Sequence, residues 1–466
     1  MIGVAGVTLA GAAVLVWSEP GVCWLIVALC VAALAVITRR ANRSDRDTVG
    51  RLERLERIGW AAGALALVAI GTIRADSGLL TWCVFAALAC GSVALAGGRS
   101  VAGIGMGAIA FVVASGRGIA WWRRGARQVR RSGSNRVRIG RTVAVSVLLV
   151  LVFGLLFASA DRTFAHVVGY AIPSFSGASV GRVILALIIV MPVALGFGYL
   201  AGGEPAFDAL PEGRSKTVRR IEWASPLAIL DVLFAIFVAV QLDFLFGGRE
   251  RVLRTSGLTY AQYARSGFWQ LLIVVALTVI VIGVAVRVAP RTHRADRVLC
   301  RVLLGGLCLL TLVIVASALN RLRVYDDAYG FTRERLAVGV IEAWLGIVFV
   351  LIICAGVALR GRWVPRTAAA MAVIALLTTA LANPDGFIAS RDVDRYQRTG
   401  RIDVSYLSGL SADAVPALQR LPPSLRGCVL SSITDELSRP EDWRSWNLDR
   451  QRARRALRGG AGSCGG

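Results

Sequence analysis

Ionisable side chains inside long apolar runs are the residues of this chain most able to carry chemistry. Asp231 lies two helical turns into the apolar run 225–246, and Glu342 lies about 8 Å into the run 337–359 at helical rise. A charged side chain at the centre of a membrane helix costs about 2.5–3.5 kcal/mol on insertion scales, so each acid invites a functional hypothesis. Hydrogen bonding between helices is the competing explanation for both residues.

A second group of ionisable residues gathers at one depth, where apolar runs end on the expected outer side of a membrane. The group consists of Asp161, Asp243, Arg265, Arg321, Asp326 and Asp327. It marks a candidate site for a lipid-linked or external ligand. The competing explanation, which we favour for Asp161, Asp243 and Arg265, is snorkelling and helix termination near headgroups. Asp326 and Asp327 offer oxygen ligands for a cation, but adjacent residues point to different faces, so a capped turn is the commoner arrangement.

The motifs of soluble enzymes and of metal sites are missing from the sequence. The stretch GRSKT at 213–217 ends like a phosphate-binding loop but lacks the first glycine and a preceding strand. Seven of the nine cysteines lie in or beside apolar runs, where cysteine acts as a small hydrophobe. Cys428 and Cys464 lie in the polar tail and can pair if that tail is outside the cell. We therefore expect no cofactor and no metal, and the sequence leans away from an enzyme.

Twelve apolar runs must position these residues. About 20 residues are needed to cross ~30 Å of hydrocarbon. The chain is 56% hydrophobic and 18% charged, which excludes a soluble globular enzyme, a disordered chain and a disulfide scaffold. We expect an all-α, polytopic transmembrane helical bundle of 11–12 spans with a small external helical C-terminal module. The runs are 2–17, 21–38, 58–73, 79–96, 101–116, 142–160, 179–200, 225–246, 267–286, 302–320, 337–359 and 367–382.

The net charge of +24 lies beside the apolar runs, so membrane topology and anionic lipid explain it better than nucleic acid does. Loop 117–141 carries nine arginines and no acid, which places it in the cytoplasm. With the later loops alternating from there, the cytoplasmic set holds 21 basic residues and the opposing set 9. This asymmetry predicts a multi-pass protein of a bacterial plasma membrane, with anionic lipid at the cytoplasmic face and residues 383–466 outside.

For the N-terminal third of the chain, hydropathy and charge predict different numbers of membrane spans. Loop 39–57 carries seven arginines and should also be cytoplasmic. Three apolar runs separate it from loop 117–141, and an odd number puts the two loops on opposite sides. Residues 97–107 are rich in glycine, so the run 101–116 is the first candidate for an interfacial or re-entrant segment. Hydropathy favours twelve spans and charge favours eleven.

Three parts are expected along the chain. Residues 1–141 form an N-terminal membrane group with its basic cytoplasmic loop, residues 142–382 form the main bundle, and residues 383–466 form the external tail. In the tail, Asn383 reads as an N-cap and Gly400 as a helix stop, and Ser411 reads as a second cap. Further tail helices are expected over 414–421, 424–437 and 440–457. Two aromatic-rich loops are expected outside the membrane, at 257–270 and 317–336.

Four strings carry a family resemblance. They are ASADRTF at 158–164, TYAQYARSGFWQL at 259–271, SALNRLRVYDDAYGFTRERL at 317–336 and NPDGFIASRDVDRYQRTGRIDVSYLSGLSADAVPAL at 383–418. Over roughly residues 142–450 the chain resembles an uncharacterised family of polytopic membrane proteins common in actinobacteria, of the "domain of unknown function" 4153/4173 type. The resemblance implies an integral membrane protein with an external C-terminal tail. It brings no activity, substrate or catalytic residue.

Three functional hypotheses follow, beneath the broader expectation of a membrane protein of unassigned activity. A transporter-like protein ranks first, because span number, interrupted helices and intramembrane acids suit it. A scaffold or sensor that binds a protein partner through its outer loops and tail ranks second. An enzyme acting on a lipid-linked substrate at the outer face ranks last, because the early outer loop offers only Asp76 beside Arg74.

Overall fold

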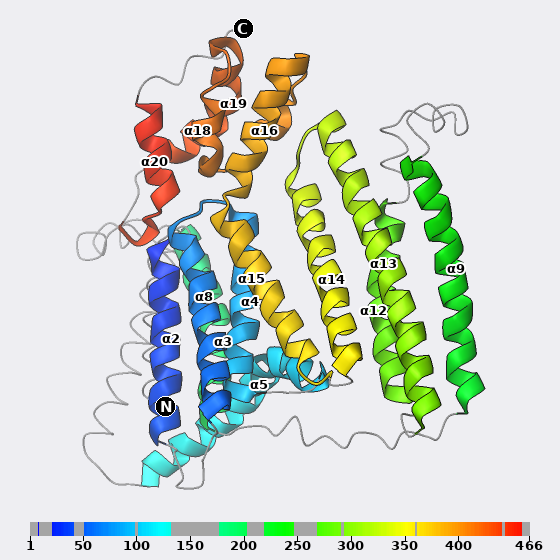
Figure 1. The fold of residues 1–466 in the computed structure, drawn as a ribbon. Coiled ribbons are helices and arrows are strands. Elements are labelled where there is room, and N and C mark those ends of the chain that lie inside the picture. The colour runs from blue at the N-terminus through cyan, green and yellow to red at the C-terminus, as the bar shows by residue number, and fades with distance from the viewer. Residues whose placement is uncertain are drawn as a thin grey trace, which may run out of the picture. The chain divides into compact units, whose positions relative to one another are not determined.

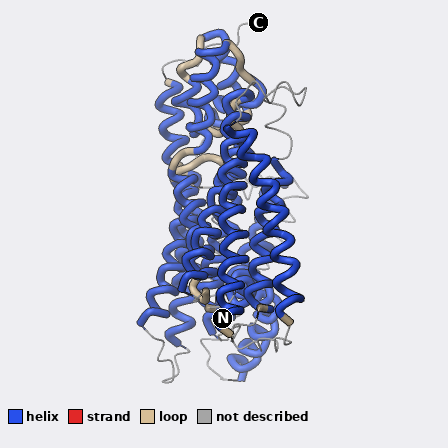
Figure 2. The backbone as a smooth tube through the Cα atoms, turned by 45° about the vertical axis from the view of Figure 1, so that its right-hand side comes forward, coloured by secondary structure: helices blue, strands red, loops and turns tan. Residues whose placement is uncertain are grey.

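The regular structure of this chain is helical throughout. In the computed structural model, residues 8, 21–41, 51–97, 101–131, 177–202, 219–246, 268–289, 293–358, 361–439 and 443–458 are described. Within these ranges no strand occurs (Figure 1 and Figure 2). Among the described residues, eight helices are long and apolar enough to cross a membrane. The chain is therefore an all-α polytopic helical protein, as predicted. The predicted runs 2–17, apart from Thr8, and 142–160 lie outside the described residues.

The chain divides into two compact units. The first holds Met1–Gly98, Ala102–Asp208 and Arg439–Arg452, and the second holds Arg99–Val101, Ala209–Ser438 and Ala453–Gly466. The boundaries that the sequence suggested near residues 141 and 382 stay predictions.

Four of the described helices of the first unit pack as two pairs, α3 with α4 and α2 with α8, and α2 and α4 also contact members of the other pair. A short helix, η1, ends α3 at the turn into α4, and Asp76 caps the next helix by accepting a hydrogen bond from Gly78 N (3.0 Å). The elements are α2 (Val22–Ala41), α3 (Arg51–Ala69), η1 (Ile70–Thr72), α4 (Ser77–Ala96), α5 (Val101–Arg131) and α8 (Gly177–Gly202).

Helix α5 runs obliquely to α3 and α4 (Figure 1). It crosses close to the end of α4, where the Ser92 hydroxyl donates to the Gly107 carbonyl. Helix α5 also contacts α8. A Cβ on Gly196 of α8 would lie 2.5 Å from the Phe111 carbonyl oxygen of α5, so the α5–α8 contact needs glycine at this position. Residues 117–131 of the expected loop 117–141 are helical, because α5 continues through the first arginines, and the cytoplasmic side of this segment stays a prediction.

One segment of the tail belongs to the first unit. The Asn447 amide donates to the carbonyls of Gly71 (2.9 Å) and Arg74 (2.7 Å) in the α3–α4 turn. Arg74 and Asp449 form a buried ion pair at 2.6 Å. The side-chain oxygen of Asn447, Oδ1, accepts from the backbone N–H groups of Asp449 and Arg450. Asn447 therefore caps the start of α20 (Leu448–Leu457). The single helix expected over 440–457 is therefore wrong: a 3₁₀ turn, η4 (Trp443–Ser445), precedes α20.

The described residues of the second unit include five long apolar helices, and α13 is central to them. It packs against α9, α12 and α14, and α14 packs against α15. Leu307, Ile314 and Phe349 are fully buried in the shared core. The helices are α9 (Arg220–Phe246), α12 (Phe268–Val288), α13 (Arg294–Tyr329), α14 (Arg333–Ala358) and α15 (Val364–Leu381).

The loop expected over 317–336 is wrong. Helix α13 has 36 residues, about 54 Å at 1.5 Å per residue, which is far more than a bilayer core requires. Hydropathy ends its apolar run near residue 320, but the polar continuation to Tyr329 stays helical. The connection to α14 is only Gly330–Thr332, and Gly330 adopts a φ of +89° that favours glycine.

The rest of the tail is a small helical module in the second unit. Asn383 caps its first helix by accepting from Gly386 N (2.9 Å), Gly400 ends that helix at a φ of +68°, and Ser411 caps η3. These three predicted signals are confirmed. The elements are α16 (Pro384–Thr399), α17 (Val404–Ser408), η3 (Ala412–Ala414), α18 (Val415–Leu418) and α19 (Pro423–Ser438).

Candidate functional site

Glu342 is the most unusual ionisable residue of the second unit. Its side chain is 0% exposed, and neither carboxyl oxygen has a hydrogen-bond partner among the described residues. It shares a face of α14 with Val338, Leu345 and Phe349, which belong to the apolar core. Burying a polar group without a hydrogen bond costs about 1–3 kcal/mol in proteins. The fold therefore bears a cost at this position that an apolar residue would avoid.

Two glycines bring α13 close to α14 on either side of Glu342. A Cβ on Gly339 would lie 3.0 Å from Leu322, and a Cβ on Gly346 would lie 3.3 Å from Val315. This antiparallel register sets Glu342 at the level of Leu319, next to Ala318, which is fully buried. Glu342 thus lies between two positions at which α13 packs closely on α14.

A hydrogen-bonded polar group joins α13 to α9 near the level of Ala318. The side-chain oxygen of Gln241, Oε1, accepts from Arg321 Nη2 (2.7 Å) and from the Ser317 hydroxyl (3.4 Å). Gln241 and Ser317 are buried. The predicted candidate Arg321 therefore binds a neighbouring helix. By register, Glu342 and these three residues lie within about one helical turn of each other along α13.

Asp231 lies at another level of the bundle. It lies beside Gly306 of α13, where a Cβ would lie 3.8 Å from Asp231 Oδ2. From there to Ala318 are twelve residues of α13, about 18 Å of helix. The two intramembrane acids singled out in the sequence are therefore brought into one bundle but not into one site.

The tip of the α13–α14 hairpin is clamped to the tail module. Arg333 donates through Nε and Nη2 to the two carboxyl oxygens of Asp385, at 2.7 and 2.5 Å. Asp385 is fully buried and also accepts from Ser411 N (2.8 Å), while Arg333 N donates to the Tyr406 hydroxyl (2.7 Å). Such a two-pronged arginine–carboxylate pair fixes both distance and orientation.

A second carboxylate, two turns further along α16 than Asp385, also holds the hairpin tip. Asp392 accepts from Phe331 N (2.9 Å), and Arg395 donates to the Ala328 carbonyl (3.0 Å). Burial raises the pKa of the Asp392 carboxyl, and the Phe331 hydrogen bond and nearby Arg395 and Arg335 offset only part of that rise. Burial also raises the pKa of the Tyr406 phenol. Sequence reasoning did not find these contacts, since their partners lie more than 50 residues apart.

Asp326 and Asp327 take different roles. Asp326 is buried and pairs with Arg335 at 3.6 Å, and the Arg335 guanidinium lies 4.1 Å from the centre of the Tyr325 ring. Asp327 is exposed. Among the described residues, no three His, Cys, Asp or Glu side chains are grouped as a metal site requires.

The remaining candidates are not brought to this site. Asp161 and Arg265 lie outside the described residues, and Asp243 lies in α9 but its side chain is likewise not described. Asp76 serves as the cap of α4. Cys428 is disulfide-bonded, while Cys464, its expected partner, is outside the described residues.

The comparison with known families decides what the chain is. The family whose description reads "domain of unknown function (DUF4153)" matches residues 62–421. The chain belongs to this family. The match begins about 80 residues earlier than the sequence resemblance indicated and includes Glu342, Arg333, Asp385 and Asp392. No curated protein and no solved structure matches the chain.

Proposed function

We propose that this DUF4153 protein is a transporter-like membrane protein and that Glu342 is its central ionisable residue. The observation that carries the proposal is a fully buried carboxyl group without a hydrogen bond from the described residues. Acids at such positions in membrane bundles serve as proton relays and ion sites. A residue that served packing alone would be better replaced by leucine or methionine.

The setting of Glu342 supports movement between α13 and α14. Gly339 and Gly346 present no side chain of their own to α13, so only the ends of Leu322 and Val315 pack against α14 at these two positions. Gln241, Ser317 and Arg321 supply hydrogen-bonding groups near the same level. A small change in helix contact would therefore bring Glu342 beside polar partners and water, which is the change that alternating access requires.

Cysteine accessibility tests the proposal without a known substrate. The seven free cysteines are replaced by serine, Cys428 is kept, and Glu342→Cys is introduced into membrane vesicles of both orientations. A charged methanethiosulfonate reagent should modify position 342 from at least one side. Ile347→Cys is the matched control, because Ile347 lies on an exposed face of the same helix that lipid would cover.

The labelling outcomes separate a pathway from a closed bundle. Modification at 342 with none at 347 supports a water-accessible path. Protection of both positions in both orientations, in a protein of normal thermal stability, contradicts the proposal.

The cellular setting belongs to the same proposal. We place the protein in a bacterial plasma membrane with the tail outside. The arginine asymmetry of the loops supports this orientation. The disulfide at Cys428 is compatible with it, because disulfides persist in oxidising compartments.

A scaffold or sensor is the second candidate, and the clamp at the hairpin tip favours it. The Arg333–Asp385 pair joins the tail module to two membrane helices, so a protein partner bound to the module would act on α13 and α14. The two candidates differ in complementation of a deletion strain. Transport predicts that Glu342→Gln abolishes complementation, whereas a scaffold predicts that Glu342→Gln complements and Asp385→Asn does not.

A further inference from the structure

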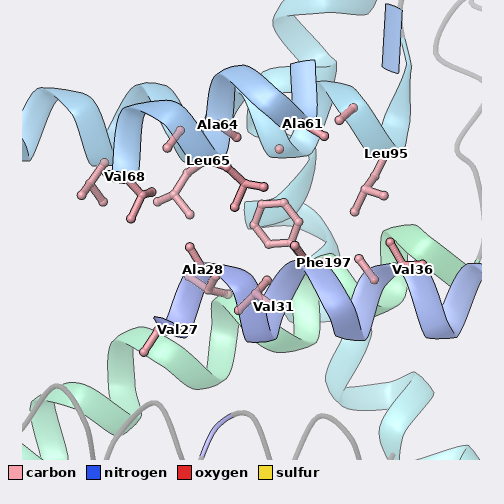
Figure 3. A pocket seen from close by; sticks show the side chains of 18 of the residues that line it. Val27, Ala28, Val31, Val36, Ala61, Ala64, Leu65, Val68, Leu95 and Phe197 are labelled. Carbon is pink, nitrogen blue, oxygen red and sulfur yellow. The ribbon is translucent and has the colours of Figure 1, made fainter. Parts of the chain in front are cut away.

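The first unit contains a cavity of about 480 Å³ enclosed by α2, α3, α4 and α8. Its size falls within the range of small-molecule sites, about 300–1,000 Å³. Figure 3 shows the Phe197 ring between the α3 side chains Ala61, Ala64 and Leu65 on one side and Val31 of α2 on the other. All residues that line the cavity belong to the first unit, whereas Glu342 belongs to the second, so the function of the cavity is argued independently.

The wall of the cavity is apolar except at one end. Apart from three arginines, every lining residue is aliphatic, aromatic or glycine, and many are alanine. Along α2 it extends from Trp24 to Arg39, about 22 Å of helix. This exceeds the ~15 Å depth of one leaflet, half of the ~30 Å hydrocarbon core. The cavity therefore has the length and surface that an acyl chain requires.

Positive charge is confined to one end. Arg39 lies in the last turn of α2, and Arg54 and Arg57 lie in the first two turns of α3. Glu53 pairs with Arg57 at 2.8 Å, but no acid lines the cavity. Arg54 is exposed and has no ion-pair partner among the residues that the structure describes. An anion at this end meets three guanidinium groups beside an apolar channel.

We propose that this cavity binds an anionic phospholipid, with its phosphate at Arg39, Arg54 and Arg57 and an acyl chain beside Phe197. The distribution of charge selects this occupant, since a wholly apolar ligand makes no contact with the charge of exposed Arg54 and a soluble anion leaves the apolar channel unfilled. Arginine binds phosphate through paired hydrogen bonds, and basic residues beside membrane helices recognise anionic headgroups.

Lipid retention by the purified full-length protein tests the site. The protein is exchanged into vesicles of phosphatidylcholine containing phosphatidylglycerol, extracted again, and its bound lipid is counted by native mass spectrometry. The double variant Arg39→Gln/Arg54→Gln should bind phosphatidylglycerol roughly tenfold or more weakly, because each basic residue near the surface contributes about a factor of five. Its matched control is Arg40→Gln/Arg51→Gln, which removes the same charge from the same helices outside the cavity.

A second pair of variants tests the channel. Ala64→Trp fills the cavity and should remove retained phosphatidylglycerol, whereas Ala66→Trp on the exposed face of α3 should not. Equal retention by the two arginine doubles, or by the two tryptophan variants, overturns the proposal. So does wild-type protein that retains no lipid, which would mean that another segment of the chain fills the cavity. A change of oligomeric state in Ala64→Trp with lipid unaltered would assign the cavity to a second copy and also overturn it.

Discussion

A carboxyl group without a hydrogen bond inside an apolar bundle weakens the fold that contains it. Glu342 is in this position, between two glycines at which α13 packs closely on α14. Replacement by methionine, which has a similar length and no polar atoms, should stabilise the protein by about 1–3 kcal/mol. Thermal unfolding of the detergent-solubilised protein measures the change. Leu345→Met on the same face is the control for the methionine itself and should cost less than about 1.5 kcal/mol.

The same substitution separates stability from activity. Glu342→Met should raise the Tm and remove function, which is the pattern expected where a fold carries a costly functional residue. A lower Tm for Glu342→Met would show that the carboxyl group is bound by groups outside the described residues. The transport proposal would then lose the observation on which it rests.

The Arg333–Asp385 pair should contribute more to stability than an exposed pair of the same chemistry. Asp385 is 0% exposed and Arg333 38%, whereas Asp394 and Arg420 are 41% and 44% exposed. Asp385→Asn leaves the guanidinium without its counter-charge and should cost about 2–3 kcal/mol, somewhat less than for a fully buried pair. Asp394→Asn should cost under about 1 kcal/mol. Thermal unfolding of both variants checks the ranking, and equal losses would contradict it.

At the residue scale, sequence reasoning found groups whose signal is local and missed those whose signal is distant. Glu342 and Asp231 stood out because an acid within an apolar run is visible in one segment of sequence. The partnership of Arg333 with Asp385 is set by where α14 and α16 meet, 52 residues apart, and no spacing rule encodes it. Arg321 was visible as a candidate, but its bond to Gln241 was not.

Helix α16 and the α13–α14 connection make a pH-sensitive element through Asp392. Arg395 and Arg335 favour its charged form and Asp403 opposes it, but burial dominates and raises its pKa above the ordinary 3.8. In the window above pH 3.8, the native state therefore holds a proton that the unfolded state has released. Stability from this residue is full below that pH and is lost as the pH rises through the native pKa.

The prediction is a pH-dependent difference between two proteins. Asp392→Asn removes the titration while its side-chain oxygen can still accept from Phe331 N. The Tm of Asp392→Asn minus that of the wild type should become more positive as the pH rises from about 4 to 7, since only the wild type loses stability there. Asp394→Asn, on the exposed side of α16, is the control and should show a flatter difference. A difference that falls with pH would contradict the sign.

Element boundaries were predictable where composition and caps agree. Asn383, Gly400 and Ser411 marked the tail helices because capping chemistry is local. The prediction was wrong where hydropathy was used as a measure of helix length. Helix α13 continues to Tyr329 because charged residues end a membrane span without ending a helix. The helix expected over 440–457 is interrupted because Asn447 bonds to the α3–α4 turn, a contact 376 residues away in sequence.

For the whole molecule, the first unit offers a way to choose between eleven and twelve spans. The tail segment containing Asn447 and Asp449 binds the α3–α4 turn, so the tail and this turn must share a side of the membrane. The far ends of α3 and α4 then lie on the other side, with the arginines of loop 39–57. Helix α5 crosses the end of α4 and has only the shorter apolar stretch Gly103–Gly118. If α5 does not cross the membrane, loops 39–57 and 117–141 lie on the same side of it. The arginine distribution and the structure then both agree with eleven spans.

Reporter fusions along the chain test this arrangement. Fusions after residues 45, 130 and 295 should read cytoplasmic, and fusions after residues 75 and 420 should read external. The pair 45 and 130 decides the role of α5, because an added crossing would give them opposite signals. The pair 75 and 420 decides the docking of the tail, because the buried Arg74–Asp449 bond cannot form across a bilayer. External signals at 45 and 295 with a cytoplasmic signal at 420 would invert the orientation. The arginine end of the proposed lipid-binding cavity would then lie in the outer leaflet, and its anionic phospholipid would have to come from that leaflet.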